Sequence, residues 1–211
     1  LLACLEGRAT VIPRARADFT RPETVLSALE AARPQAVFNA AAYTAVDKAE
    51  SEPEAARLVN AETPGRIARW CAERGIPFVH YSTDYVYDGS GTRPWTEDSP
   101  TAPLSIYGAS KRDGDDAVAA AGGPHLIFRT SWLYDATGKN FLNTMLRLGA
   151  ERERLSVVVD QHGAPTYVPH LAEASGRAYE AAFGSPSLLS PSRHPRRSEA
   201  ESGDLGEAPR S

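Results

Sequence analysis

The sequence predicts an α/β protein whose central sheet is mostly parallel and covered by helices on both faces. Short apolar segments typical of buried strands alternate with amphipathic helical segments from Thr10 to Phe183, and this alternation is typical of doubly wound parallel sheets. Small or polar residues directly follow several strand segments, at the edge where open α/β sheets bind ligands. We therefore expect a Rossmann-like domain at residues 1–183.

The end of the chain has a different composition. From Gly184 onward Ser, Pro, Arg and Glu dominate, and periodic apolar residues are almost absent. Such a segment does not bury enough apolar surface to offset the entropy of ordering it. We expect residues 184–211 to form a disordered tail.

Length and charge narrow the class of protein. The chain has 211 residues and a net charge of -4, with acidic and basic residues interspersed, which fits one domain and suggests neither a nucleic acid nor a membrane as partner. Cys4 and Cys71 are too few and too far apart for a disulfide framework or a metal site. No apolar run approaches the ~20 residues of a membrane span. We expect a soluble, cytoplasmic protein without a metal ion.

The beginning of the chain differs from that of a usual dinucleotide-binding fold. Such a fold opens with a strand and a glycine-rich turn that packs against the pyrophosphate. Here Leu1–Leu5 resemble the last turns of a helix and Thr10–Ile12 a short strand, with no such turn before them. The first strand and the glycine-rich turn are thus expected to be lacking. We expect either a fragment of a longer protein or a chain that has lost its main cofactor anchor, and we favour the fragment.

The remaining elements follow from apolar spacing and from helix start and stop signals. The predicted helices are 20–32, opened by a capping box of Thr20 and Glu23, then 53–74, broken or re-capped at Thr63–Pro64, then 107–121, 140–153 and 168–183. The predicted strands are 10–12, 36–38, 78–82, 125–129 and 155–160. The connection at 88–103 exceeds the usual loop length, so we expect a binding loop there.

Tyr107 and Lys111 form the candidate catalytic pair. They lie four residues apart in a predicted helix, so both side chains point to the same side of it. A phenol has an ordinary pKa near 10, and a nearby ammonium lowers this value, which makes the phenol a usable acid–base group. Thr83, at the end of the preceding strand, can hydrogen-bond the same substrate oxygen. The set predicts protonation of an alkoxide as a hydride reaches a carbonyl carbon, although tyrosine and lysine at this spacing also arise by chance on solvated helices.

Four segments around these residues resemble the dTDP-4-dehydrorhamnose reductases, a branch of the extended short-chain dehydrogenase/reductase superfamily. They are Asn39–Glu52, His80–Tyr87, Pro103–Lys111 and Arg129–Tyr134, and the resemblance runs from about Asp18 to Glu180. It implies reduction of dTDP-4-dehydro-L-rhamnose to dTDP-L-rhamnose by hydride transfer from NADPH or NADH. A dTDP-sugar as substrate and a homodimer as assembly are further implications.

The resemblance also assigns roles to single residues. The catalytic residues would be Tyr107, Lys111 and Thr83; the cofactor would contact Asp18, Phe19, Ala42, Tyr43, Thr44, Tyr81, Tyr107 and Lys111; the sugar nucleotide would contact Thr83, Asp84 and Trp132. Arg14 and Arg16 follow a strand at whose end an arginine accommodates the 2′-phosphate of NADPH in related folds, so they weakly favour NADPH. Spacing alone also fits plainer interpretations: two solvated arginines, a core Phe19, a packing contact at Ala42 and a core Trp132.

Two other functions remain open. A nucleotide-sugar epimerase or dehydratase of the same superfamily commonly carries an Asp-Glu pair near the Ser-Thr turn, whereas this chain has Asp84 followed by Tyr85. A non-catalytic binding subunit, as in relatives that regulate methionine adenosyltransferase, is favoured by the missing glycine turn. The intact Tyr107 and Lys111 disfavour it.

Overall fold

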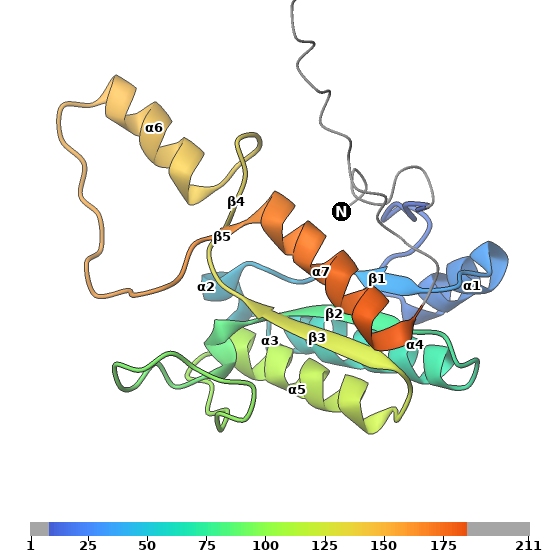
Figure 1. The fold of residues 1–211 in the computed structure, drawn as a ribbon. Helices are drawn as coiled ribbons and strands as arrows, with labels where there is room; N and C mark the ends of the chain where they lie inside the picture. Colours follow the sequence, from blue (N-terminus) through green and yellow to red (C-terminus); the bar gives the residue numbers. More distant parts are fainter. Residues whose placement is uncertain (1–8, 185–211) are drawn as a thin grey trace, which may run out of the picture.

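The computed structural model describes residues 9–184, and a parallel sheet lies at its centre (Figure 1). The strands are β1 (Val37–Asn39), β2 (Phe78–Thr83) and β3 (His125–Thr130), in the order β1-β2-β3. Both pairs are parallel, with Asn39 opposite His80 and Thr83 opposite Thr130. The carboxyl ends of β2 and β3 therefore meet at one edge of the sheet.

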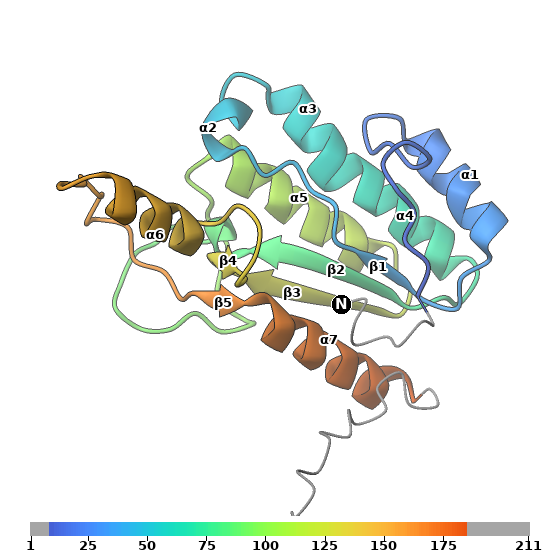
Figure 2. The same cartoon turned by 90° about the horizontal axis from the view of Figure 1, so that it is seen from above.

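Helices cover both faces of this sheet (Figures 1 and 2). The α-helices of the described residues are α1 (Pro22–Ala32), α2 (Val46–Ala49), α3 (Pro53–Arg57), α4 (Thr63–Ala72), α5 (Ile106–Ala120), α6 (Phe141–Glu151) and α7 (Val168–Phe183). Helices α4 and α5 lie on one face, and α7 crosses the other, where Tyr179 packs against Phe38 of β1 with ring centroids 5.6 Å apart. The predicted α/β class with a mostly parallel sheet is confirmed.

The apolar core lies between the sheet and the helices α1, α4 and α5. It includes Val25 and Leu29 of α1, Ile67 and Trp70 of α4, Phe78 of β2 and Val118 of α5, all of which are buried. Cys71 lies in the same cluster, and burial raises the pKa of its thiol to about 12, so it is an inert packing residue. The core holds the amino-terminal half of β2 and the carboxyl-terminal half of α5. The carboxyl end of β2 and the first turns of α5, which carry polar side chains, lie outside this core.

The helical stretch predicted at 53–74 contains a π-helical turn. Helices α3 and α4 are joined by Leu58–Glu62, which forms π-type turns directly before Thr63 and Pro64. Proline has no N–H for the usual helical hydrogen bond, so a wider turn upstream keeps the helix continuous. The expected break is thus a local widening, and it brings Asn60 inside the fold.

Two expectations for the first described residues are wrong. Thr10–Ile12 form no strand in the described part of the chain; they run as an irregular segment from which Ile12 packs against the core. Thr20 and Glu23 form no capping box, because α1 begins at Pro22 and its N-cap, Arg21, makes no side-chain capping bond. Proline at the first helical position needs no N–H partner, so the helix starts without this cap.

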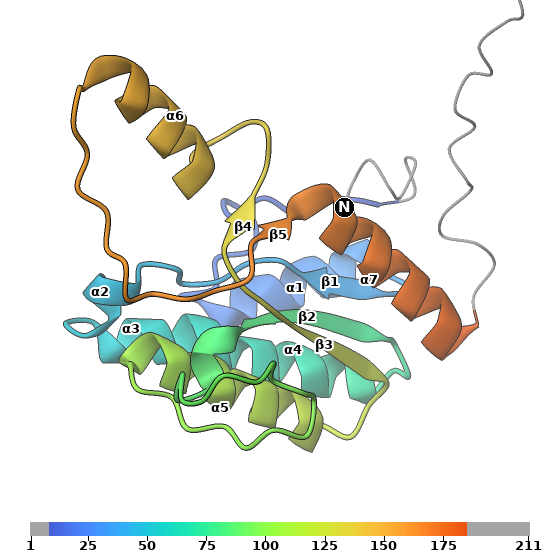
Figure 3. The same cartoon turned by 60° about the vertical axis from the view of Figure 1, so that its left-hand side comes forward.

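The strand predicted at 155–160 is also wrong. These residues are irregular and exposed, with Val159 88% accessible. A strand requires a partner, and the second sheet consists instead of β4 (Leu133–Tyr134) paired in parallel with β5 (Thr166–Tyr167). Figure 3 shows α6 lying away from the main sheet.

The other predicted elements agree closely with the structure. The helices at 107–121, 140–153 and 168–183 correspond to α5, α6 and α7, and the connection at 88–103 is a loop. The predicted helix end at Leu1–Leu5 and the predicted tail after Gly184 lie outside the described residues. Among residues 9–184, none of the helices combines the length and the apolar character that a membrane crossing requires.

Candidate active site

The candidate site begins where β2 ends. Thr83 is the last residue of the strand and is buried, and its Oγ1 accepts the N–H of Tyr85 at 3.3 Å and donates to Asp84 Oδ1 at 3.2 Å. These bonds turn the chain into a short 3-10 helix, Asp84–Val86. The Thr83 hydroxyl is thereby fixed at the carboxyl edge of the sheet.

Helix α5 brings Tyr107 to the same place. Its N-cap Ser105 accepts the N–H of Gly108 at 3.1 Å, and a Cβ at Gly108 would overlap the carbonyl oxygen of Tyr85. Glycine at that position lets the first turn of α5 approach the strand end closely. Tyr107 then packs edge-on against Tyr85, with centroids 5.5 Å apart, and its phenol lies close enough to Thr83 for that hydroxyl to influence its pKa. The structure thus brings together the two hydroxyls that the sequence analysis paired.

The electrostatics of Tyr107 differ from the expectation. Its pKa is raised above the ordinary value, chiefly because burial disfavours the phenolate; the nearby Thr83 hydroxyl lowers the pKa, and the charge of Asp84 raises it. Lys111 is not among the groups that shift this pKa. The expected lowering by the lysine is therefore not seen in this arrangement.

Lys111 points instead toward the strand. It is 1% exposed, and its Nζ donates to the carbonyl oxygen of Tyr81 at 2.6 Å and lies 3.4 Å from His80 Nε2. Burial lowers the pKa of Lys111 to about 8, although the charge of Asp115 favours the protonated form. An ammonium that loses its proton this easily is typical of a functional site.

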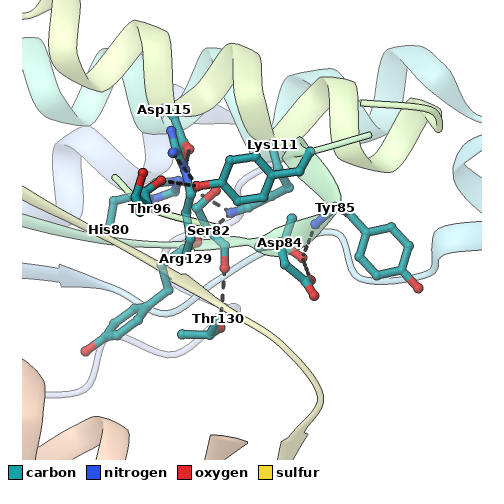
Figure 4. A network of polar contacts seen from close by, with 12 residues as sticks. His80, Ser82, Asp84, Tyr85, Thr96, Lys111, Asp115, Arg129 and Thr130 are labelled. Carbon is teal, nitrogen blue, oxygen red and sulfur yellow. Dashed lines mark hydrogen bonds and ion pairs between the residues drawn. The ribbon is translucent and has the colours of Figure 1, made fainter. Parts of the chain in front are cut away.

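A second polar group lies beside the lysine and ties α5 to the loop at 88–103 (Figure 4). Asp115 is buried and pairs with Arg129 of β3, Nε to Oδ2, at 3.1 Å. Arg129 also donates to the Tyr87 hydroxyl at 2.9 Å, and Tyr87 stacks on Trp95 with centroids 4.6 Å apart. The network anchors the start and the middle of the loop to the strand that ends in the site.

Sequence reasoning missed His80, Asp115 and Arg129. One signal was available: Tyr107, Lys111 and Asp115 repeat at four-residue spacing, so they form one polar stripe on a helix that packs on the sheet. His80 gave a similar signal as a polar residue on the same face of a buried strand as Phe78.

The expected cofactor residues at the end of β1 are held by Asn60. This residue of the π-helical turn accepts the N–H of Tyr43 at 2.8 Å and donates to the Tyr43 carbonyl at 3.1 Å. It also donates to Ser110 of α5 at 3.0 Å. The backbone next to Ala42 and Thr44 is thereby fixed relative to the helix that carries Tyr107, and Ala42 and Thr44 are exposed.

Asp18 and Phe19 form a separate cluster before α1. The Asp18 carboxylate accepts the N–H and the hydroxyl of Thr20, at 3.0 and 2.8 Å, and these bonds lower its pKa. Phe19 packs against the core, and its carbonyl accepts a bond from Thr63. Arg14 and Arg16 are exposed, and Arg14 Nε lies 4.0 Å from Asp18.

Trp132 and Tyr81 occupy defined positions near the carboxyl edge. Trp132 follows β3, has φ of 45°, is 39% exposed and packs against Phe141 with centroids 5.8 Å apart. A positive φ is strained for a tryptophan, and such strain often occurs at functional sites. Tyr81 stacks on Phe128, and its carbonyl holds Lys111.

Comparison with known proteins shows which family this chain is similar to. A dTDP-4-dehydrorhamnose reductase of Burkholderia thailandensis is 50% identical over 177 residues, covering 84% of this chain and 59% of the relative. The enzyme of the same name from Escherichia coli K12 is 49% identical over 171 residues, covering 81% of this chain and 57% of the relative. The chain thus spans less than two thirds of the length of these relatives.

A solved structure agrees with these relatives in fold. It is a dTDP-4-dehydrorhamnose reductase of Bacillus anthracis in complex with NADP, 38% identical, with a TM-score of 0.78, covering 82% of this chain and 61% of the other. The model of the RmlD substrate binding domain matches residues 2–190. This chain belongs to the RmlD substrate binding domain family.

Proposed function

We propose that this chain carries the proton-donating site of an NAD(P)H-dependent reductase that converts dTDP-4-dehydro-L-rhamnose to dTDP-L-rhamnose. The observation that carries the proposal is the proximity of the Tyr107 phenol and the Thr83 hydroxyl at the carboxyl edge of the sheet, with Lys111 one turn further along α5. About half of the residues are identical to those of curated reductases over the matched length, which supports the same reaction.

The residues of this chain would act on the oxygen of the sugar carbonyl. Tyr107 donates its phenolic proton to the oxygen at C4, and the Thr83 hydroxyl turns its one hydrogen from Asp84 to the same atom. The developing negative charge is thereby stabilised and then neutralised. The raised pKa of Tyr107 keeps the phenol protonated before this step. Asp84, next to Thr83, would orient the sugar hydroxyls, and Trp132 would pack against the sugar nucleotide.

The donor groups of the site fit a nicotinamide cofactor. A bound nicotinamide cofactor supplies the hydride that reaches C4. The Lys111 ammonium has three donors, of which Tyr81 accepts one, so it can also bind the ribose hydroxyls. The exposed Ala42 and Thr44 beside the clamped Tyr43 give a flat edge for the rest of the cofactor.

We propose NADPH as the preferred cofactor. Arg14 and Arg16 are exposed cations before α1, close in sequence to Asp18 and Phe19, which would hold the adenosine. The ion pair between Arg14 and Asp18 shows that the two side chains lie next to each other. This supports the proposal that both contact the adenosine end of the cofactor. A 2′-phosphate would replace part of this pairing with a charge-assisted bond.

A hybrid enzyme tests the proposed reaction independently of the parts of the relatives that this chain does not span. Residues 10–183 replace the matching segment of the Burkholderia thailandensis relative, and NADPH oxidation is followed with dTDP-4-dehydro-L-rhamnose. We expect turnover within about tenfold of the parent enzyme. A folded hybrid that binds NADPH but reduces no sugar would favour a non-catalytic binding subunit. Turnover only with the substrate of a nucleotide-sugar epimerase would favour an epimerase.

A further inference from the structure

Lys111 stands at the end of a line of buried polar side chains that crosses the sheet. Asn39 of β1 and His80 of β2 are register partners, and Asn39 Nδ2 lies 3.0 Å from His80 Nδ1. On the other side of the ring, His80 Nε2 lies 3.4 Å from Lys111 Nζ. The three residues are 4%, 0% and 1% exposed, so water does not compete for these contacts.

The direction of the first hydrogen bond is fixed by the backbone. The N–H of Ala41 donates to Asn39 Oδ1 at 3.1 Å, which places the amide oxygen of Asn39 away from the histidine and its NH₂ group toward it. The NH₂ group can only donate, so His80 Nδ1 must accept. Burial, aided by the charge of Lys111, lowers the pKa of His80 to about 3, so the ring is neutral and carries its one proton on Nε2.

In this tautomer the Nε2–H group of His80 points at Lys111 Nζ. A protonated Lys111 has no lone pair and offers only further N–H groups to His80 Nε2–H, so the two repel. A neutral amine has a lone pair that accepts the Nε2–H. The Tyr81 carbonyl, 2.6 Å from Lys111 Nζ, accepts a lysine hydrogen in both states. It bonds the ammonium more strongly than the neutral amine, so it opposes the effect of His80.

We propose that His80 is a positioning residue that Asn39 holds as an Nε2–H donor, so that the Lys111 ammonium is destabilised relative to the neutral amine. Lys111 then exchanges a proton near neutral pH rather than carrying a permanent charge. A role for this proton exchange in sugar reduction rests on the proposed function. The effect of His80 on the ionisation of Lys111 does not depend on that function.

The other groups around Lys111 act differently. On α5, Asp115 lies one turn ahead and favours the ammonium, but its carboxylate is shared with Arg129 of β3 at 3.1 Å. Tyr107 lies one turn behind on the same helix, and β2 contributes His80 and the carbonyl of Tyr81. Burial is the largest cause of the lowered pKa of Lys111, so a test must separate burial from the histidine.

The tautomer of His80 is the first observable. The chain has five histidines, and heteronuclear NMR of their ring nitrogens distinguishes the Nε2–H, Nδ1–H and doubly protonated forms, with His80→Phe assigning the signal. We expect the Nε2–H form at about pH 7. The Nδ1–H form or the cation in the wild-type chain would overturn the proposal, even if no variant folds.

The titration of Lys111 is the second observable. The chain contains only three lysines, Lys48, Lys111 and Lys139, so selectively labelled lysine Cε signals resolve each one, and Lys111→Met assigns the signal of interest. In the variant Asn39→Asp, the new carboxylate can only accept a hydrogen bond, so it favours the tautomer of His80 that carries its proton on Nδ1. The Nε2 atom of His80 then has a lone pair and accepts a hydrogen bond from the Lys111 ammonium. We expect the titration midpoint of Lys111 to rise by about one pH unit or more.

A double-variant cycle separates this effect from the new charge. In the His80→Phe background, Asn39→Asp introduces the same carboxylate without a ring to relay its effect, so we expect less than about half of the shift. An equal shift in both backgrounds would show that the carboxylate acts through space and would overturn the proposal. A failed hybrid assay would contradict the reductase proposal and leave these titrations unchanged, so the two proposals fail separately.

Discussion

The burial of Lys111 carries a large electrostatic cost for the fold. Its pKa falls from 10.5 to about 8 in the folded chain because burial disfavours the charged form, which corresponds to a penalty of roughly 3 kcal/mol at neutral pH. The bond to the Tyr81 carbonyl offsets part of this penalty. A group retained at such a cost is typical of a site selected for function rather than stability.

Lys111→Met should therefore stabilise the chain. The thioether fills a similar volume without a charge, and we expect the free energy of unfolding at about pH 7 to rise by roughly 1–2 kcal/mol, after the loss of the bond to Tyr81. Because the folded pKa lies below the unfolded one, the wild type regains stability as pH rises from about 8 to 10.5. The advantage of the variant should shrink over that range.

Urea denaturation at about pH 7 and at about pH 10 measures both effects. Lys139→Met is the matched control, because Lys139 is exposed and its replacement should change stability little. A loss of stability in Lys111→Met at both pH values would show that the lysine contributes more through its hydrogen bonds than it costs through burial.

At this scale the sequence predicted only part of the site. The four-residue spacing of Tyr107 and Lys111 and the position of Thr83 after a strand follow from local periodicity, and the structure brings Tyr107 and Thr83 together. The direction of the Lys111 ammonium was not predictable, because it depends on Tyr81 and His80 of the neighbouring strand. The roles assigned to Asp18, Phe19 and Trp132 stay predictions.

At the scale of elements, α5 depends on its close contact with the π-helical turn. A Cβ at Gly114 would overlap the carbonyl oxygen of Asn60. The same Asn60 clamps Tyr43 and bonds Ser110. The absence of a side chain at Gly114 therefore sets the distance between α5, which carries Tyr107 and Lys111, and the segment that would line the cofactor.

Gly114→Ala should destabilise the chain by about 2 kcal/mol. The overlap forces the helices apart, and this cost exceeds the ~1 kcal/mol that alanine gains over glycine inside a helix. The midpoint and slope of urea denaturation give the change. Gly149→Ala in α6 is the matched control, because its Cβ meets no atom within 4 Å and we expect a small gain. A gain at both positions would mean that α5 moves aside without cost.

Helices were more predictable than strands for a physical reason. A helix satisfies its hydrogen bonds within one segment, so the periodicity of 107–121, 140–153 and 168–183 was enough to find α5, α6 and α7. A strand needs a partner, and apolar residues at Thr10–Ile12 and 155–160 do not reveal whether one is present. The pairing of β4 with β5 joins residues about thirty positions apart, which no local pattern shows.

At the scale of the whole molecule, the proposed preference for NADPH rests on residues before α1, far in sequence from Tyr107. In the hybrid enzyme we expect the double change Arg14→Ala and Arg16→Ala to weaken NADPH binding about 10- to 100-fold, because charge-assisted bonds to a 2′-phosphate are lost, and to leave NADH binding nearly unchanged. Calorimetric titration with both cofactors measures this.

The control for cofactor choice removes the same charge elsewhere. Arg152 and Arg154 are exposed after α6, and their replacement by alanine should change neither affinity beyond about twofold. Equal losses for NADPH and NADH in the Arg14 and Arg16 variant would show that these arginines do not recognise the phosphate.

Replacement of Tyr107 by phenylalanine in the hybrid enzyme tests the central claim most directly. The ring keeps its packing against Tyr85, and only the proton donor is lost. With Tyr134→Phe as the control, we expect kcat for dTDP-4-dehydro-L-rhamnose reduction to fall ~100- to 10,000-fold while the Kd for NADPH stays within about twofold. An unchanged kcat in Tyr107→Phe would contradict the assignment of Tyr107 as the acid.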